Sequence, residues 1–354
     1  MKLFKEYNKN GLTLKNRVVM APMTRTRAIG NVPNELMKTY YSQRAGSGLI
    51  ITEGTSPSIN GLGYPRIPGA YSDEQAEGWK LVADGVHDKG GKIFVQLMHT
   101  GRVSSSQNIP EGGEVIAPSA ILLEGEMFTE TGMVPHDAPR EMTIDDIIKS
   151  QQEYVDSAKK LIDSGVDGVE LHAANGYLME QFINPNSNQR KDEYGGDYKN
   201  RARFVIETAK LVANSIGVEK VGIRFSPYGA YNGMLSDYPE LEATYTYLAN
   251  ELKKIGISYI HLVDQRVAMG APEFPNDIKK LIKQEFEGTM IVGGDIDTAE
   301  KGEALINEGY DLVYIGRPFI ANPNLIEKLK DGSELTQPDF DKFYAADAEG
   351  YTTY

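Results

Sequence analysis

A histidine, an asparagine and a tyrosine stand close together in the segment His172-Ala173-Ala174-Asn175-Gly176-Tyr177. His172 and Asn175 are three residues apart, so their N–H donors can converge on one oxygen and stabilise negative charge that develops there. A tyrosine with an ordinary pKa of about 10 keeps its proton at neutral pH and can act as a proton donor. The residue types suggest a pocket for a carbonyl oxygen, but a satisfied, buried histidine beside a core tyrosine fits the segment equally well.

Convergence of these side chains places a condition on the backbone. An ideal helix would carry Tyr177, five residues after His172, well off the same face. The sequence therefore predicts an irregular loop after Leu171, between a strand that bears His172 and the helix that follows it.

Eight short apolar, β-branched runs recur along the chain, each followed by polar residues or glycine and then by an amphipathic stretch. One such stretch, Thr143–Ser164, has apolar residues at helical spacing behind a Thr143/Asp146 capping signature. Alternating strands and helices indicate an α/β protein with a parallel sheet, and eight units close naturally into a (βα)8 TIM barrel. An open, doubly wound sheet is the alternative. The expected strands are Arg17–Ala21, Gly48–Glu53, Lys92–Leu97, Gly168–His172, Lys220–Phe225, Tyr259–Val263, Thr289–Gly293 and Asp311–Gly316.

Two stretches break this alternation. Residues 101–141 are rich in Gly, Pro, Ser and Glu and show little periodicity, so we expect an excursion over the barrel mouth. The irregular segment Ser226–Pro239 predicts a second active-site loop. The length of 354 residues suits one elaborated barrel, which predicts a single domain over residues 1–354.

Barrel enzymes place their active sites at the carboxyl ends of the strands. Hydrogen-bonding residues or glycines follow every expected strand: Pro22-Met23-Thr24, Gly54, Gln96 with His99, His172 with Asn175, Arg224, Asp264-Gln265-Arg266, Gly293-Gly294 and Gly316-Arg317. Any one of them is weak evidence, because polar residues end most strands. Their recurrence predicts an active site at this end of the barrel.

Glycines follow the seventh and eighth expected strands, as Gly293-Gly294 and Gly316-Arg317. Barrels commonly hold a phosphate there, because glycine lets backbone N–H groups approach it closely. The Arg317 guanidinium adds a positive fork suited to phosphate oxygens, and its alternative role is to pair with a neighbouring acidic side chain. A phosphate at this place requires Asp295, which follows the glycines directly, to point away.

Two further polar residues end apolar strands. The charge of Arg224 is either paired inside the barrel or compensates a ligand anion. The amide of Gln96 offers both a donor and an acceptor, as a heterocycle with alternating N–H and C=O groups would need.

Composition narrows the classes of function. A formal net charge of −13 disfavours nucleic-acid or anionic-membrane binding, and no apolar run is long enough to span a bilayer. The N-terminus shows no signal peptide, so we expect a cytoplasmic protein. With no cysteine and five histidines that lack an H-E-x-x-H pattern, we expect no metal site. G-x-G-x-x-G dinucleotide, phosphate-loop and G-x-S-x-G hydrolase motifs are also absent.

Several longer segments carry a recognisable pattern: Asn16–Thr24 (NRVVMAPMT), Gln96–Arg102 (QLMHTGR), Gly168–Leu178 (GVELHAANGYL), Asn188–Arg190 with Asp192–Gly196, Asp311–Pro318 (DLVYIGRP) and Ala348–Thr352 (AEGYT). Together they resemble the old yellow enzyme family of FMN-dependent ene reductases, and the match runs the whole chain.

The resemblance implies roles for the matching residues, with Thr24 tuning the flavin and Arg224 facing its N1/C2 edge. The implied FMN contacts are Pro22, Met23, Thr24, Gly54, Gln96, His172 and Arg224 at the ring and Gly293, Gly294, Gly316 and Arg317 at the phosphate. The implied catalytic residues are His172 and Asn175, which bind the substrate oxygen, and Tyr177, which gives the proton. Met98 and Tyr344 complete the implied substrate pocket.

The implied reaction has two halves. NADH or NADPH delivers a hydride to FMN and leaves, and an electron-poor alkene then takes that hydride at its β carbon while Tyr177 protonates the α carbon. The implied partners are small molecules such as enones, maleimides, nitro compounds and nitrate esters, and the expected assembly is a monomer or homodimer. The alternatives are a non-catalytic flavin-binding or sensor protein and a flavin-free, phosphate-binding aldolase or isomerase, although no strand end offers the lysine of an aldolase.

The sequence departs from the family pattern at three places. Met98 stands where many relatives have tryptophan, which predicts a roomier and more adaptable pocket. Gly54 replaces a common alanine, and Asp295 follows the glycine pair where a neutral residue is usual.

Overall fold

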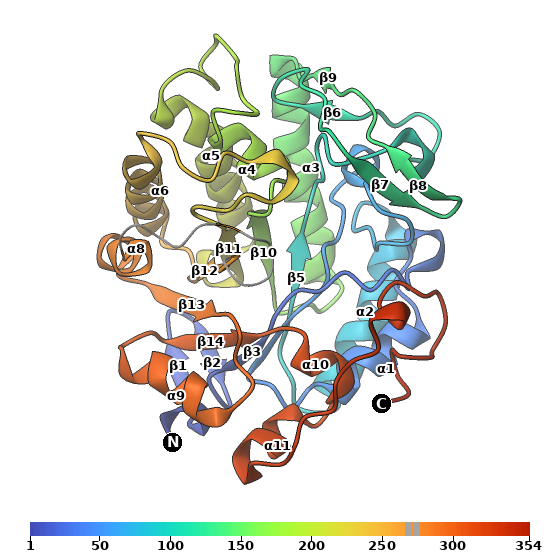
Figure 1. Ribbon diagram of the computed structural model, residues 1–354, viewed down its shortest axis with the longest axis vertical. Helices are drawn as coiled ribbons and strands as arrows, with labels where there is room; N and C mark the ends of the chain where they lie inside the picture. The colour runs from blue at the N-terminus through green and yellow to red at the C-terminus, as the bar shows by residue number, and fades with distance from the viewer. Residues whose placement is uncertain (266–270, 272–276) are drawn as a thin grey trace.

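The computed structural model describes residues 1–265, 271 and 277–354, and its centre is a closed parallel barrel (Figure 1). Each of the eight expected strands is confirmed, with bounds that differ by at most two residues. The open-sheet alternative is wrong because the last of these strands pairs with the first and closes the ring. The barrel strands are β3 Val18–Met20, β4 Leu49–Ile51, β5 Ile93–Leu97, β10 Gly168–Ala173, β11 Val221–Phe225, β12 Tyr259–Leu262, β13 Thr289–Gly293 and β14 Leu312–Ile315.

Helices surround the barrel, and their buried faces complete its core. They are α1 Glu35–Gln43, α2 Asp73–His87, α3 Ile144–Asp163, α4 Leu178–Ile183, α5 Tyr198–Ile216, α6 Leu241–Ile255, α8 Ile278–Phe286, α9 Ala299–Asn307, α10 Pro318–Ala321 and α11 Leu325–Asp331. The expected cap of α3 is confirmed, because the Asp146 N–H donates to Thr143 Oγ1 and the Thr143 N–H donates to Asp146 Oδ2. None of the described helices combines the length and apolar character that crossing a membrane requires.

The connection from β5 to α3 forms the expected excursion beside the barrel mouth. It contains a hairpin of β7 Glu126–Thr129 and β8 Gly132–Pro135, and a short pair of β6 Ile116–Ala117 and β9 Arg140–Glu141. These small strands were not expected, because the segment has little alternation of polar and apolar residues. The excursion places apolar and polar side chains over the mouth.

The opposite end of the barrel is covered by an N-terminal hairpin of β1 Tyr7–Lys9 and β2 Leu12–Leu14. Tyr7 shares a hydrogen bond of 2.7 Å with Thr289 at the start of β13, and the hairpin packs on Phe94 and Tyr259 inside the barrel. The barrel is therefore a packed core that opens toward solvent at its carboxyl end.

Candidate active site

A cavity of about 500 Å³ lies at the carboxyl ends of the barrel strands. The ten predicted site residues that line it are Pro22, Thr24, Gly54, Gln96, Met98, His172, Asn175, Tyr177, Arg224 and Tyr344. Five others, Met23, Gly293, Gly294, Gly316 and Arg317, are not among the side chains that line it. Most of the predicted substrate pocket and flavin-ring site is therefore one continuous space.

The segment after β10 has the irregular loop that the spacing of the three side chains demanded. Asn175 and Gly176 both have positive φ angles, 59° and 74°, and Tyr177 is the N-cap of α4. A Cβ at position 176 would lie 2.6 Å from Asn232 Cβ, so this position has room only for glycine. The turn brings the Tyr177 ring to 5.1 Å from the His172 ring, measured between centroids.

The amide of Asn175 is fixed so that its donor is free to face the cavity. Backbone N–H groups of Ala230 and Tyr231 both donate to Gln265 Oε1, at 2.9 and 3.3 Å, so the Gln265 amide nitrogen must donate elsewhere. It donates to Asn175 Oδ1 at 2.8 Å. Since Oδ1 is thus occupied, Nδ2 of Asn175 is the atom that can bind a ligand oxygen.

His172 is buried, and its pKa is lowered well below the ordinary value by burial and by the positive charge of Arg224. The imidazole is therefore neutral at pH 7. Nδ1 of His172 has no hydrogen-bond partner among the residues that the structure describes, so this nitrogen is left for a ligand.

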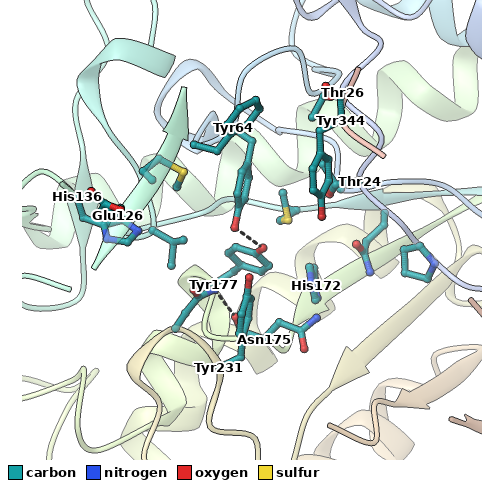
Figure 2. A pocket seen from close by; sticks show the side chains of 18 of the residues that line it. Thr24, Thr26, Tyr64, Glu126, His136, His172, Asn175, Tyr177, Tyr231 and Tyr344 are labelled. Carbon is teal, nitrogen blue, oxygen red and sulfur yellow. Dashed lines mark hydrogen bonds between the residues drawn. The ribbon is translucent and has the colours of Figure 1, made fainter. Parts of the chain in front are cut away.

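Tyr177 is buried with its hydroxyl 3.0 Å from that of Tyr64, and Figure 2 shows the two tyrosines pointing toward one another. Burial raises the pKa of Tyr177, so the phenol remains protonated at neutral pH. Tyr64 was not predicted from the sequence, because it does not directly follow any of the expected strands. Tyr231, also in the cavity wall, belongs to the loop predicted at Ser226–Pro239.

Beneath the cavity a buried carboxylate links three strands. Glu170 accepts hydrogen bonds from Gln96 Nε2 at 2.8 Å and His261 Nδ1 at 2.9 Å, and both Glu170 and His261 are fully buried. Burial alone would raise the pKa of Glu170, but His261, Arg224 and Gln96 outweigh it and keep the pKa low. Because Gln96 Nε2 donates to Glu170, the identity of the amide atoms is fixed and the Gln96 oxygen can accept from a ligand N–H.

Arg224 in β11 pairs with His172 in β10, and the negative charge of Glu170 stabilises the charged guanidinium. Its Nε is nevertheless buried without a partner among the described residues. Both roles expected for Arg224 are compatible with the structure. Glu170 balances its charge inside the barrel, and its Nε is left to donate to a ligand. The unpartnered Arg224 Nε and His172 Nδ1 fit a flat, polar heterocycle such as the flavin ring.

Met98 and Gly54 occupy complementary space. A Cβ at Gly54 would lie 2.5 Å from the sulfur and the terminal methyl of Met98, which is itself only 2% exposed. These two departures from the family pattern are therefore coupled, because the thioether fills the volume that an alanine methyl would need.

The predicted phosphate residues lie together at the ends of β13 and β14. Gly294 has a φ of 113°, and Gly316 lies against Met23, whose sulfur would be 3.8 Å from an added Cβ. Arg317 is exposed and has no ion-pair partner in the described ranges, so the alternative of pairing with an acidic neighbour is not observed. Asp295 is exposed, and that its carboxylate points away from a phosphate stays a prediction. Arg266, which follows β12, lies outside the described residues.

Tyr344 reaches the cavity from the C-terminal segment, which the sequence could connect to the site only through the resemblance. The Tyr344 carbonyl accepts hydrogen bonds from Thr26 Oγ1 and Arg66 Nη2, at 3.0 and 3.1 Å. The fully buried Arg25 and Arg27 side chains donate to further carbonyls between residues 342 and 350. Loop residues near the start of the barrel therefore hold the end of the chain against the site.

A closed parallel barrel with a polar cavity at the carboxyl ends of its strands is the arrangement typical of (βα)8-barrel enzymes. Residues 2–336 match the model of the NADH:flavin oxidoreductase / NADH oxidase family, and the chain belongs to that family. Its resemblance to the old yellow enzymes is confirmed. FMN is the flavin of this family, and the flavin-free aldolase or isomerase alternative is wrong.

The similarity extends over the full length of relatives and solved structures. The chain is 38% identical to putative 12-oxophytodienoate reductase 11 of Oryza sativa subsp. japonica, over 99% of this chain and 96% of that protein. It is 37% identical to a probable flavin mononucleotide-dependent alkene reductase of Leishmania infantum, over 97% and 94% of the two chains.

Among solved structures, morphinone reductase superposes with a TM-score of 0.94 at 41% identity, covering 99% of this chain and 95% of that one. The old yellow enzyme homologue of Zymomonas mobilis superposes with a TM-score of 0.95 at 36% identity, covering 100% and 99%.

Proposed function

We propose that the protein reduces the C=C bond of electron-poor alkenes such as enones and maleimides, with nitro compounds and nitrate esters as further candidate substrates. The observation that carries this proposal is the convergence of Asn175 Nδ2, neutral His172 and protonated Tyr177 on one cavity. Relatives named as an alkene reductase, 12-oxophytodienoate reductases and morphinone reductase support it.

In this proposal FMN supplies hydride transfer between NADH or NADPH and the alkene. The ring is held by Pro22, Met23, Thr24, Gly54, Gln96, His172 and Arg224, and the phosphate by Gly293, Gly294, Gly316 and Arg317. A related morphinone reductase structure contains tetrahydroNAD, which supports a visiting nicotinamide.

The residues of the chain supply binding and the proton. Asn175 and His172 bind the carbonyl or nitro oxygen and stabilise the charge it gains, an effect of a few kcal/mol for each well-placed donor. Tyr177 then gives its phenolic proton to the α carbon, so that one hydride and one proton add across the double bond. Met98 and Tyr344 shape the pocket around the alkene. The cytoplasmic location and the monomeric or homodimeric state stay predictions.

The absorption spectrum of the purified protein tests the proposal. We expect a yellow protein that NADH or NADPH bleaches and that 2-cyclohexenone turns yellow again, which would also exclude a non-catalytic flavin sensor. The Tyr177→Phe variant should slow reoxidation by 2-cyclohexenone more than bleaching by the nicotinamide. A colourless protein that takes up no added FMN contradicts the proposal, and equal losses in both half-reactions contradict the role of Tyr177.

A further inference from the structure

A buried carboxyl group lies directly behind the loop that carries Asn175 and Tyr177. Glu180, in α4, is 3% exposed and has no cationic partner among the described residues. Its Oε2 accepts the backbone N–H of Gly176 at 2.6 Å, and the Ser226 hydroxyl lies 2.8 and 2.9 Å from its two oxygens. An acidic side chain buried without a cation requires an explanation, because burial disfavours its charged form.

Ser226 extends this contact to the neighbouring residue. Its hydroxyl oxygen, just after β11, accepts the backbone N–H of Asn175 at 2.8 Å, so its own proton is directed to Glu180. One carboxyl group therefore anchors two successive backbone N–H groups. The Gly176 N–H donates to Glu180 directly, and the Asn175 N–H donates to Ser226, which in turn donates to Glu180.

These two N–H groups belong to the residues with left-handed backbone angles. A left-handed conformation is unfavourable for a residue with a side chain, and Asn175 adopts it in this turn. Such strain persists only where surrounding contacts hold it. Glu180, in α4, and Ser226, just after β11, supply those contacts, and neither residue is among those that line the cavity.

We propose that Glu180 is a positioning residue which, with Ser226, holds the Asn175–Gly176 turn and so sets the placement of the Asn175 amide and the Tyr177 hydroxyl. The inference rests on the proposed function of those two groups and adds the residues that fix their geometry. An error of about 1 Å in such a geometry can lower a rate by about a hundredfold.

Three variants separate this role from general stability. Glu180→Leu and Ser226→Ala remove acceptors behind the turn, whereas Glu180→Gln keeps an oxygen for the Gly176 N–H. Thr208→Val in α5 is the matched control, because it removes a buried hydroxyl whose one hydrogen bond among the described residues is to the Phe204 carbonyl of its own helix.

The first measurement is backbone hydrogen exchange by mass spectrometry over residues 173–178, in the FMN-loaded protein. We expect exchange to accelerate about tenfold or more in Glu180→Leu and Ser226→Ala, and to remain near wild type in Glu180→Gln and Thr208→Val. The second measurement is 2-cyclohexenone reduction, where the same two variants should lose about tenfold or more in kcat/KM and keep the FMN Kd of wild type.

Unchanged exchange in Glu180→Leu overturns the inference, whether or not the protein reduces alkenes. Faster exchange with wild-type kinetics overturns it as well, because the turn would then not govern the chemistry. If Glu180→Leu does not fold, Ser226→Ala decides both measurements. A wild-type protein that reduces no alkene contradicts the proposed function instead, while the exchange data still test the hold on the turn.

Discussion

The two halves of the barrel mouth are built in different ways. In the half at the ends of β10 and β11, called the substrate half because we propose that it binds the substrate, Gln265 donates to the Asn175 amide oxygen and Glu180 accepts the Gly176 N–H of the left-handed turn. In the β13–β14 half, Gly294 and Arg317 are exposed, and Arg317 has no ion-pair partner among the described residues. Hydrogen bonds within the first half fix the geometry of its turn and its Asn175 amide, whereas the second half offers an exposed positive charge at Arg317. We therefore expect the halves to control rate and cofactor affinity separately.

The sharpest way to break this comparison is Asn175→Asp. Aspartate tolerates the positive φ and still accepts from Gln265, but it replaces the Nδ2 donor with an oxygen that repels developing negative charge. Stopped-flow reoxidation by 2-cyclohexenone should slow by about a hundredfold or more. The FMN Kd should change by less than about twofold, since the phosphate residues lie elsewhere. A loss of FMN as large as the loss of rate would show that the halves are not separate.

Burial gives the substrate half a dependence on pH. Burial raises the pKa of Glu180 from 4.5 to about 7. Between these values the unfolded chain has released the proton and the folded protein retains it, so the unfolding free energy falls by about 1.4 kcal/mol per pH unit as pH rises. The total decrease in unfolding free energy is roughly 3 kcal/mol. The decrease is complete above pH 7 and absent below pH 4.5.

Urea unfolding of wild type and Glu180→Gln at pH 5 and pH 8 measures this effect. The variant lacks the titrating group, so its stability relative to wild type should be higher at pH 8 than at pH 5 by a few kcal/mol. Other ionisable groups are common to both proteins and cancel in the difference. A difference that is the same at both pH values would mean that Glu180 titrates normally.

Arg317→Ala tests the other half. Loss of a charge-assisted contact of about 1.5–3 kcal/mol should raise the FMN Kd by about tenfold to a hundredfold. Titration of the apoprotein with FMN, followed by quenching of flavin fluorescence, measures this. The control is Arg203→Ala, which removes an equal charge from a half-buried position on α5, where Arg203 donates to the Glu193 carbonyl and pairs with Glu207. At saturating FMN the alkene reduction rate should stay within about twofold of wild type, and a larger drop would assign Arg317 to the chemistry.

Gly54→Ala should have the smallest effect and concerns the boundary between the halves. The added methyl would displace the end of Met98 into the cavity, which we expect to raise KM by about threefold for bulky enones while leaving 2-cyclohexenone unaffected. Steady-state kinetics with a substrate series checks this, and the Gly54→Ala/Met98→Ala double variant should recover the bulky substrates. If the double variant does not recover them, the methyl itself obstructs the ligand.

The barrel was predictable because its strands are buried on both faces and therefore have continuous apolar runs. The irregular loop at Asn175 followed from helix geometry alone. The phosphate residues were predicted from their position after the last two strands, and their role stays a prediction. The N-terminal hairpin could also have been found, because Asn10-Gly11 between Tyr7–Lys9 and Leu12–Leu14 is a strong turn signal. That residues 1–354 form one domain stays a prediction.

Other parts of the site were out of reach of sequence reasoning. Glu170 and His261 lie in apolar strands 91 residues apart, and only the closed register shows that they share a hydrogen bond. Tyr64 meets Tyr177 across 113 residues of chain, with no local pattern at either position that links them. Such pairs depend on tertiary contacts, which carry no periodic signal in a single sequence.

The hold of Arg25 and Arg27 on the C-terminal segment has a consequence for the order of folding. The bond from Arg25 to the Phe343 carbonyl joins residues 318 apart, so it closes a loop of nearly the whole chain. Closing so long a loop has a high entropic cost until the intervening barrel has formed and shortened it. We therefore expect Tyr344 to dock last, after a barrel intermediate in which one wall of the cavity is still unfolded.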